Sequence, residues 1–150
     1  MRDAHLVVVG ADQELARTRA AVAASKLSAR VHFTGGQEDV KPWYGMADCF
    51  VLPTLYDPFP NAALEAMACG LPVITSSQCG AAELIESGVE GYVCRDPLDV
   101  VELGRCLNLA AAPGQVQRMG SAARRRVEPF SLERMAQQLS ALYAQLTRAP

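Results

Sequence analysis

The sequence predicts an α/β fold in which a parallel sheet carries helices on both faces. Up to residue 94, short runs of β-branched and aromatic residues alternate with longer helical stretches. Two neighbouring parallel strands need a crossover connection, and that connection is usually a helix. Ligands of such sheets bind beyond the carboxyl ends of the strands, so we expect the functional site at that edge.

Five segments have the composition of strands. Each is short and apolar, and several end at Gly or Ser. In chain order they are HLVVVG (5–10), RVHFTG (30–35), CFVLPT (49–54), PVITSS (72–77) and GYVC (91–94). We expect all five to join one parallel sheet.

Helical segments fill the spaces between these strands. Gly70 and Gly88 stand where two of the helices should end, because glycine readily adopts the left-handed conformation that closes a helix. The segments cover residues 12–27, 37–48, 61–69 and 80–87.

No strand pattern follows residue 97. Three helices are expected there, over 97–111, 114–127 and 131–146. Asp96 is the expected N-cap of the first, with Pro97 at its first position. We expect these helices to pack on the sheet edge or on a region outside this sequence.

Composition narrows the function. With 150 residues, half of them hydrophobic and a fifth charged, the chain suits one globular domain. Its net charge of −2 and pI near 5.7 give no basic surface for nucleic acid. No apolar run reaches membrane-spanning length, and an acid follows Met1 too soon for a signal peptide. We therefore expect a soluble, cytoplasmic protein.

The cysteines and histidines indicate neither disulfides nor a metal. The cysteines are odd in number and lie mostly in apolar segments, so we interpret them as reduced, buried thiols. A zinc site would require a C-x-x-C pair or closely spaced His and Cys, and the two histidines lie in predicted strands. These residues are Cys49, Cys69, Cys79, Cys94, Cys106, His5 and His32.

The segment YDPFPNAALEAMACGLP (56–72) leads from a strand into a helix and contains two acids, Asp57 and Glu65. Pro58 and Pro60 restrict the backbone on both sides of Phe59, so the Asp57 carboxylate is presented on a stiff loop. A loop fixed in advance suits recognition of a ligand.

The helix expected from Asn61 offers a binding site for an anion. Its first N–H groups have no partner within the helix, and Ala62 and Ala63 leave space for an approaching phosphate. Glu65 lies one turn further on the same face as Asn61. Its carboxylate can accept two hydrogen bonds from a vicinal diol. The pattern therefore predicts a ligand with hydroxyls at both ends and phosphate between them.

The motifs DPFPNAALEAMACGLPVIT, CGAAELI and GVEGYV resemble the donor-binding half of the retaining GT-B glycosyltransferases of family four. The closest branch is the lipopolysaccharide-core glucosyltransferases. The resemblance implies a Rossmann-like domain over residues 1–150, the C-terminal half of a GT-B fold, with the N-terminal acceptor domain absent. Two features depart from the family: the first acid is usually Glu, and the basic residues that clamp the diphosphate would precede Met1.

The resemblance implies a role for each site residue. Asp57 would be the catalytic-site residue that hydrogen-bonds a hydroxyl of the donor sugar, and Glu65 would bind the nucleotide ribose. The amides of the helix start would hold the diphosphate, and the backbone after the second strand would wall the base. The implied donor-binding residues are Gly35, Gly36, Val40, Asn61, Ala62, Ala63 and Glu65.

The implied function is retaining transfer of a hexose from a UDP-sugar to a lipopolysaccharide-core or other glycan acceptor. UDP-glucose is the first candidate for the donor. The acceptor would bind the missing domain, so this fragment alone would be inactive. No cofactor or metal would be needed. Peripheral association of the parent protein with the inner membrane is a further expectation.

Two other classes stay open. A glycoside hydrolase also uses paired carboxylates, but nothing in the sequence around Asp57 indicates a desolvated acid. A non-catalytic nucleotide-binding module would need the same loop and helix. Gly35 and Gly36 also suit an ordinary turn, and Glu83 and the arginine run 124–126 suit solvated helix faces.

Overall fold

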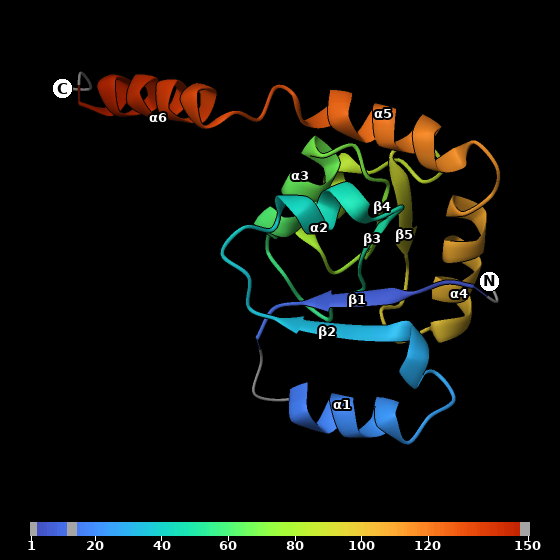
Figure 1. The fold of residues 1–150 in the computed structure, drawn as a ribbon. Helices are drawn as coiled ribbons and strands as arrows, with labels where there is room; N and C mark the ends of the chain where they lie inside the picture. The colour runs from blue at the N-terminus through green and yellow to red at the C-terminus, as the bar shows by residue number, and fades with distance from the viewer. Residues whose placement is uncertain (1–2, 12–14, 148–150) are drawn as a thin grey trace. The chain divides into compact units, whose positions relative to one another are not determined.

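The computed structural model describes residues 3–11 and 15–147. The chain forms two compact units, residues 1–46 and 47–150. Figure 1 shows the course of the chain through both. No helix in the described residues is long and apolar enough to span a membrane.

The first unit is built on two parallel strands, β1 (Leu6–Val9) and β2 (Val31–Gly35). Helix α1 (Leu15–Ala23) and the short 3-10 helix η1 (Ser28–Arg30) connect them, and α2 (Lys41–Met46) follows. Arg19 of α1 lies over the ring of Phe33, 4.7 Å from its centroid, and so fixes α1 to β2.

The second unit contains a three-stranded parallel sheet in the order β3-β4-β5. The strands are β3 (Phe50–Leu52), β4 (Val73–Ser76) and β5 (Gly91–Cys94). Its helices are α3 (Asn61–Ala68), the 3-10 helix η2 (Gly80–Leu84), α4 (Val100–Ala110), α5 (Gln115–Val127) and α6 (Leu132–Leu146).

The core of the second unit is centred on β4, whose four residues are all buried. Ile74 and Cys94 pack against Cys106 and Ala110 of α4. Helix α3 contacts β3, β4 and α5, so helices cover both faces of the sheet (Figure 1). The loop that leads to α3 follows the carboxyl end of β3, and Ser76 at the end of β4 bonds to this loop.

Helices α3 and α5 approach at two glycines. A Cβ atom added at Gly120 would lie only 2.0 Å from the carbonyl oxygen of Gly70. Gly70 also ends α3 as predicted: its φ is +79°, and its N–H donates to the Met67 carbonyl. Glycine is therefore needed on both sides of this contact.

All five predicted strands are present and parallel, and the predicted α/β class is confirmed. The prediction of a single sheet is wrong, because β1 pairs with β2 in one sheet and β3, β4 and β5 form another. Strand–helix alternation predicts the direction of neighbouring strands. It does not determine which strands share hydrogen bonds.

Two helix predictions need correction. The segment expected as a helix over 80–87 is the 3-10 helix η2, so Gly88, although its φ is +92°, ends no α-helix. The N-cap of α4 is Asp99, whose carboxylate accepts hydrogen bonds from the N–H groups of Val101 and Glu102. Asp96 accepts instead from the Leu98 N–H, which closes a local turn before the helix.

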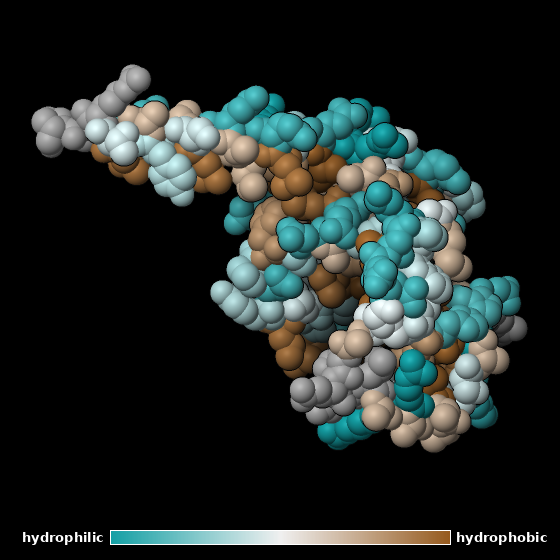
Figure 2. Space-filling view, turned by 60° about the vertical axis from the view of Figure 1, so that its left-hand side comes forward, coloured by the Kyte–Doolittle hydropathy of each residue, from teal (hydrophilic) through white to brown (hydrophobic). Residues whose placement is uncertain are grey.

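The cysteines and helix α6 differ in part from what the sequence predicts. All five cysteines are free, and Cys79, Cys94 and Cys106 are buried, but Cys69 is exposed, contrary to the expectation. Ser131 is the N-cap of helix α6, its hydroxyl accepts from the Arg134 N–H, and none of the residues of α6 is buried. Figure 2 shows hydrophobic surface along one side of the arm formed by this helix.

Candidate functional site

The loop between β3 and α3 leaves the sheet at the carboxyl end of β3, as predicted. The hydroxyl of Ser76, the last residue of β4, donates to the Thr54 carbonyl at 2.5 Å. The neighbouring Thr75 hydroxyl donates to the Leu52 carbonyl at 2.8 Å. These two bonds fix the start of the loop to the central strand.

Asp57 is held by its backbone on both sides. Its N–H donates to the Gln78 carbonyl at 3.2 Å, and its carbonyl accepts from the Gly80 N–H at 2.9 Å. These bonds form a parallel bridge between Asp57 and Cys79. The residue that the sequence singled out is therefore fixed to the segment that follows β4.

The Asp57 side chain is half-buried, and only one of its oxygens is used internally. Oδ1 accepts from the Phe59 N–H at 3.1 Å, which makes a tight turn through Pro58. Within the described part of the chain, Oδ2 has no hydrogen-bond partner. That oxygen can accept a hydrogen bond from a ligand hydroxyl.

Helix α3 begins without a side-chain cap. Its N-cap is Pro60, in an extended conformation, which makes no side-chain cap hydrogen bond. The Ala63 N–H donates to the Pro60 carbonyl at 3.1 Å, and Ala63 is fully buried. The expectation of an unpaired N–H at Ala63 is therefore wrong, because the first turn closes on Pro60. Asn61 is exposed and Ala62 is half-buried.

Glu65 lies one turn into α3 and is exposed, whereas Ala63, Ala66 and Met67 of the same helix are buried. Since residues four apart share a helix face, Glu65 stands on the same face as Asn61. The structure thus places Asp57, Asn61 and Glu65 on one loop–helix junction at the carboxyl end of β3.

The other predicted site residues lie at the carboxyl end of β2, in the first unit. Gly35 ends the strand with a φ of +72°, and its carbonyl accepts from the Gly10 N–H at 2.9 Å. Gly36 is exposed, and the Val40 carbonyl accepts from the N–H groups of Trp43 and Tyr44 at the start of α2. Their role in binding a base stays a prediction.

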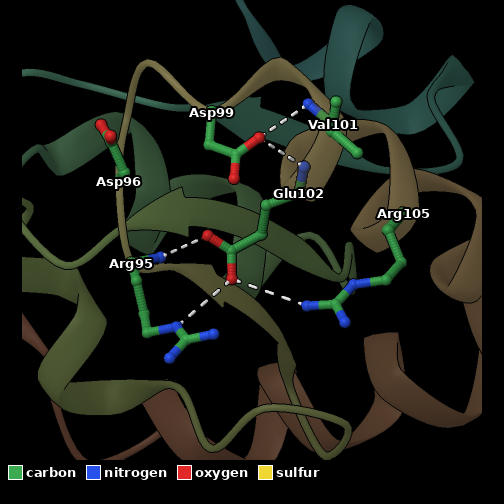
Figure 3. Close-up of a pocket in the computed structure, with 6 residues that line it drawn as sticks. All are labelled: Arg95, Asp96, Asp99, Val101, Glu102 and Arg105. Carbon is green, nitrogen blue, oxygen red and sulfur yellow. Dashed lines mark hydrogen bonds and ion pairs between the residues drawn. The ribbon is translucent and has the colours of Figure 1, made fainter.

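A charged pocket of about 550 Å³ lies at the carboxyl end of β5. Figure 3 shows the Glu102 carboxylate between the guanidinium groups of Arg95 and Arg105, at 3.8 Å and 3.6 Å. Its second oxygen accepts from the Arg95 N–H at 2.9 Å. The pocket is lined by Arg95, Asp96, Asp99, Val101, Glu102 and Arg105.

The sequence analysis did not predict this pocket. Its position after β5 nevertheless follows the rule used for Asp57, that ligands bind beyond the carboxyl ends of parallel strands. Its arginines already face a carboxylate of the chain, and the first turn of α4 is already capped by Asp99. We therefore expect this pocket to attract an anion less strongly than the start of α3 does.

Comparison with known proteins identifies the family. Residues 1–109 match the family described as "Glycosyl transferases group 1". The chain belongs to the group 1 glycosyltransferases. A curated relative, the N-acetyl-alpha-D-glucosaminyl L-malate synthase of Bacillus anthracis, is 32% identical over 149 residues, which are 97% of this chain and 39% of that protein. The chain therefore spans about two fifths of the length of this relative.

Solved structures of glycosyltransferases have the same fold. Sucrose-phosphate synthase from Thermosynechococcus elongatus matches with a TM-score of 0.88 and 32% identity, over 97% of this chain and 39% of that one. Anabaena HepE, solved with UDP-glucose, matches with a TM-score of 0.84 and 25% identity, over 94% of this chain and 41% of that one. The predicted glycosyltransferase family and GT-B fold class are confirmed.

Proposed function

We propose that this glycosyltransferase chain is the donor-binding domain of a retaining hexosyltransferase whose donor is a UDP-sugar. UDP-glucose is the first candidate for this donor. The observation that carries the proposal is the loop–helix junction at the carboxyl end of β3. It combines a helix start without a side-chain cap, an aspartate whose Oδ2 has no partner among the described residues, and an exposed glutamate one turn later. The UDP-glucose bound in the HepE structure supports the choice of donor.

The start of α3 is the proposed diphosphate site. The helix dipole places partial positive charge there, and the first turn contains no acidic residue. Asn61 and Ala62 lie at the edge of this turn, and the buried Ala63 supplies a small, rigid floor. During transfer, the same dipole would stabilise the charge that develops on the departing diphosphate.

Glu65 is the proposed ribose ligand, because its exposed carboxylate lies one turn beyond the phosphate site and can accept from both hydroxyls of a vicinal diol. Gly35, Gly36 and Val40 are the proposed wall for the base. A glycine pair after a strand lets a planar ring approach the backbone.

Asp57 is the proposed ligand of the donor hexose, through Oδ2. The bridge to Cys79 and the turn to Phe59 fix this oxygen before the donor arrives, so binding costs little conformational freedom. Its part in catalysis is to orient the hexose while the bond from the anomeric carbon to the diphosphate breaks and a bond to the acceptor oxygen forms.

The acceptor is proposed to be a lipopolysaccharide-core or other glycan hydroxyl held by a preceding N-terminal domain. The parent protein would act in the cytoplasm, or at the inner face of the membrane. Neither cofactor nor metal enters the proposal, since the donor already carries its leaving group. Hydrolysis of a free oligosaccharide by the chain would favour the glycoside hydrolase instead.

Nucleotide titration tests the proposal. Amide chemical shifts of the isotopically labelled chain should move at Gly35, Gly36, Asn61, Ala62 and Glu65 when UDP or UDP-glucose is added. GDP-mannose and ADP-glucose should produce smaller changes at equal concentration. The Glu128→Gln variant, which changes an exposed acid at the end of α5, should respond like the wild type. Shifts confined to α4, α5 and α6 would contradict the proposed site.

A further inference from the structure

The segment after β4 approaches the Asp57 loop more closely than a side chain would allow. Gly80 donates its N–H to the Asp57 carbonyl at 2.9 Å. A Cβ atom built at Gly80 would lie 1.7 Å from the Pro58 carbonyl oxygen and 3.2 Å from Cδ2 of Phe59. Contacts of real Cβ atoms are essentially never under 3.0 Å, so any other residue at position 80 requires movement.

The need for glycine here is one of space, since the φ of Gly80 lies outside the left-handed region. The residues beside Gly80 prevent that segment from moving away. Cys79 is 3% exposed and Ala81 is fully buried, whereas Pro58 is exposed and Phe59 is 39% exposed. A side chain at position 80 would therefore displace the turn formed by residues 57–59.

Displacement of this turn moves Asp57 but not the body of α3. Pro58 follows Asp57 directly, and the turn is closed by the bond from the Phe59 N–H to the Asp57 carboxylate. A shift of the Pro58 carbonyl therefore passes to Oδ2. Glu65, in contrast, is carried by a helix whose residues Ala63, Ala66 and Met67 are buried.

We propose that Gly80 is a positioning residue for the hexose of the donor: by lacking a side chain, it sets the place of the Asp57 carboxylate relative to the start of α3. This inference rests on the proposed function. It adds a separation of roles, in which the segment 78–80 controls recognition of the sugar and the body of α3 controls recognition of the nucleotide.

The Gly80→Ala variant tests this separation in direct binding to UDP and UDP-glucose. UDP affinity should stay within about twofold of the wild type. UDP-glucose affinity should fall about 10- to 100-fold, the loss expected for one charge-assisted hydrogen bond. Gly104→Ala is the matched control, because a Cβ there meets nothing within 4 Å. Its affinities for both ligands should be unchanged.

A double-mutant cycle shows whether Gly80 acts through Asp57. In an Asp57→Ala background, Gly80→Ala should cause no further loss of UDP-glucose affinity. Additive losses would overturn the inference, as would equal losses for UDP and UDP-glucose in the single variant. Failure of the wild-type chain to bind either nucleotide would instead overturn the proposed function, and the inference with it.

Hydrogen exchange of the wild-type chain gives a measurement that does not depend on the folding of a variant. Saturating UDP-glucose should slow exchange of the Gly80 N–H, because a hexose bound to Asp57 would stabilise the hydrogen bond from this N–H to the Asp57 carbonyl. Saturating UDP alone should leave this rate unchanged. Equal protection by the two ligands would overturn the separation of roles.

Discussion

Helices α3 and α4 begin after strands of the same parallel sheet, yet their first turns differ. The start of α4 is closed by the chain itself: Asp99 accepts from two N–H groups at 2.9 Å, and Glu102 adds a carboxylate in the first turn. The start of α3 has a proline as N-cap, which makes no side-chain cap hydrogen bond, and no acid in its first turn.

This difference teaches where the fold has room for a ligand. A side-chain cap satisfies the amides of a helix start and stabilises the protein, commonly by about 0.5–2 kcal/mol. An uncapped start forgoes that stabilisation and leaves positive charge for a bound anion. The cap of α4 therefore contributes to stability, and the start of α3 is the proposed binding site.

The largest expected effect concerns the thiol beneath α4. Burial, and then the bond to Cys106, raise the pKa of Cys94 to about 12. The unfolded chain, whose thiol titrates near 9, therefore releases this proton first as the pH rises. The free energy of unfolding should fall above pH 9 by about 1.4 kcal/mol per pH unit for this thiol, until about pH 12.

Denaturant unfolding at several pH values measures this loss. The Cys94→Ala variant should show a slope that is shallower by that amount. Cys69→Ala, which removes an exposed thiol, is the matched variant for comparison. Identical slopes for Cys94→Ala and the wild type would show that the thiol beneath α4 does not contribute.

The second effect concerns binding at α3. Glu65→Ala should weaken UDP binding by about 1.5–3 kcal/mol, the range for a hydrogen bond to a charged group. Thermal unfolding should change little, because Glu65 is exposed. Isothermal titration calorimetry measures the first quantity and circular dichroism the second. Unchanged UDP affinity would remove Glu65 from the site.

The third effect is the converse at α4. Asp99→Ala removes both cap bonds and should lower the free energy of unfolding by about 0.5–2 kcal/mol. UDP affinity should be unaffected, since this junction binds no nucleotide in the proposal. Asp99→Asn, which keeps an acceptor, should recover most of the stability. A loss of UDP affinity at constant stability would mean that the two junctions are not separate.

The smallest expected effect comes from a substitution that gives the start of α3 an acidic residue, as the start of α4 already has. Asn61→Asp adds an acid to the first turn of α3 and should stabilise the unliganded chain by about 0.3–1 kcal/mol through the helix dipole. The same charge should repel a diphosphate and weaken UDP binding. Asn61→Ser, which adds no charge, should do neither. Tighter UDP binding by Asn61→Asp would contradict an anion site at α3.

Much of the fold could be predicted from the sequence because its signals are local. The runs HLVVVG and PVITSS are apolar and β-branched, and both contain strands. The predicted start of α4 is wrong because the segment DPLD contains two aspartates that each accept a hydrogen bond from a nearby N–H. Such bonds are possible in a turn and in a helix cap alike, so composition does not distinguish them.

The candidate site is predicted from the same kind of local signal, and what the sequence does not predict of it depends on contacts between distant segments. Asp57, Asn61 and Glu65 follow a strand and start a helix, which a sequence can indicate. The role of Gly80 could not be predicted, because its contact with Pro58 joins segments more than twenty residues apart in the chain. The bond from the Ala63 N–H to Pro60 depends on the conformation of one loop.

The contact between Gly70 and Gly120 imposes an order on folding during synthesis. The strands β3 and β4 and the helix between them leave the ribosome well before α5, and pairing of β3 with β4 already brings the Asp57 loop to the segment that follows β4. The side of α3 that contacts α5 stays uncovered until Gly120 arrives. A nascent chain stalled before α5 would therefore present an apolar helix face to chaperones while its loop–helix junction was already assembled.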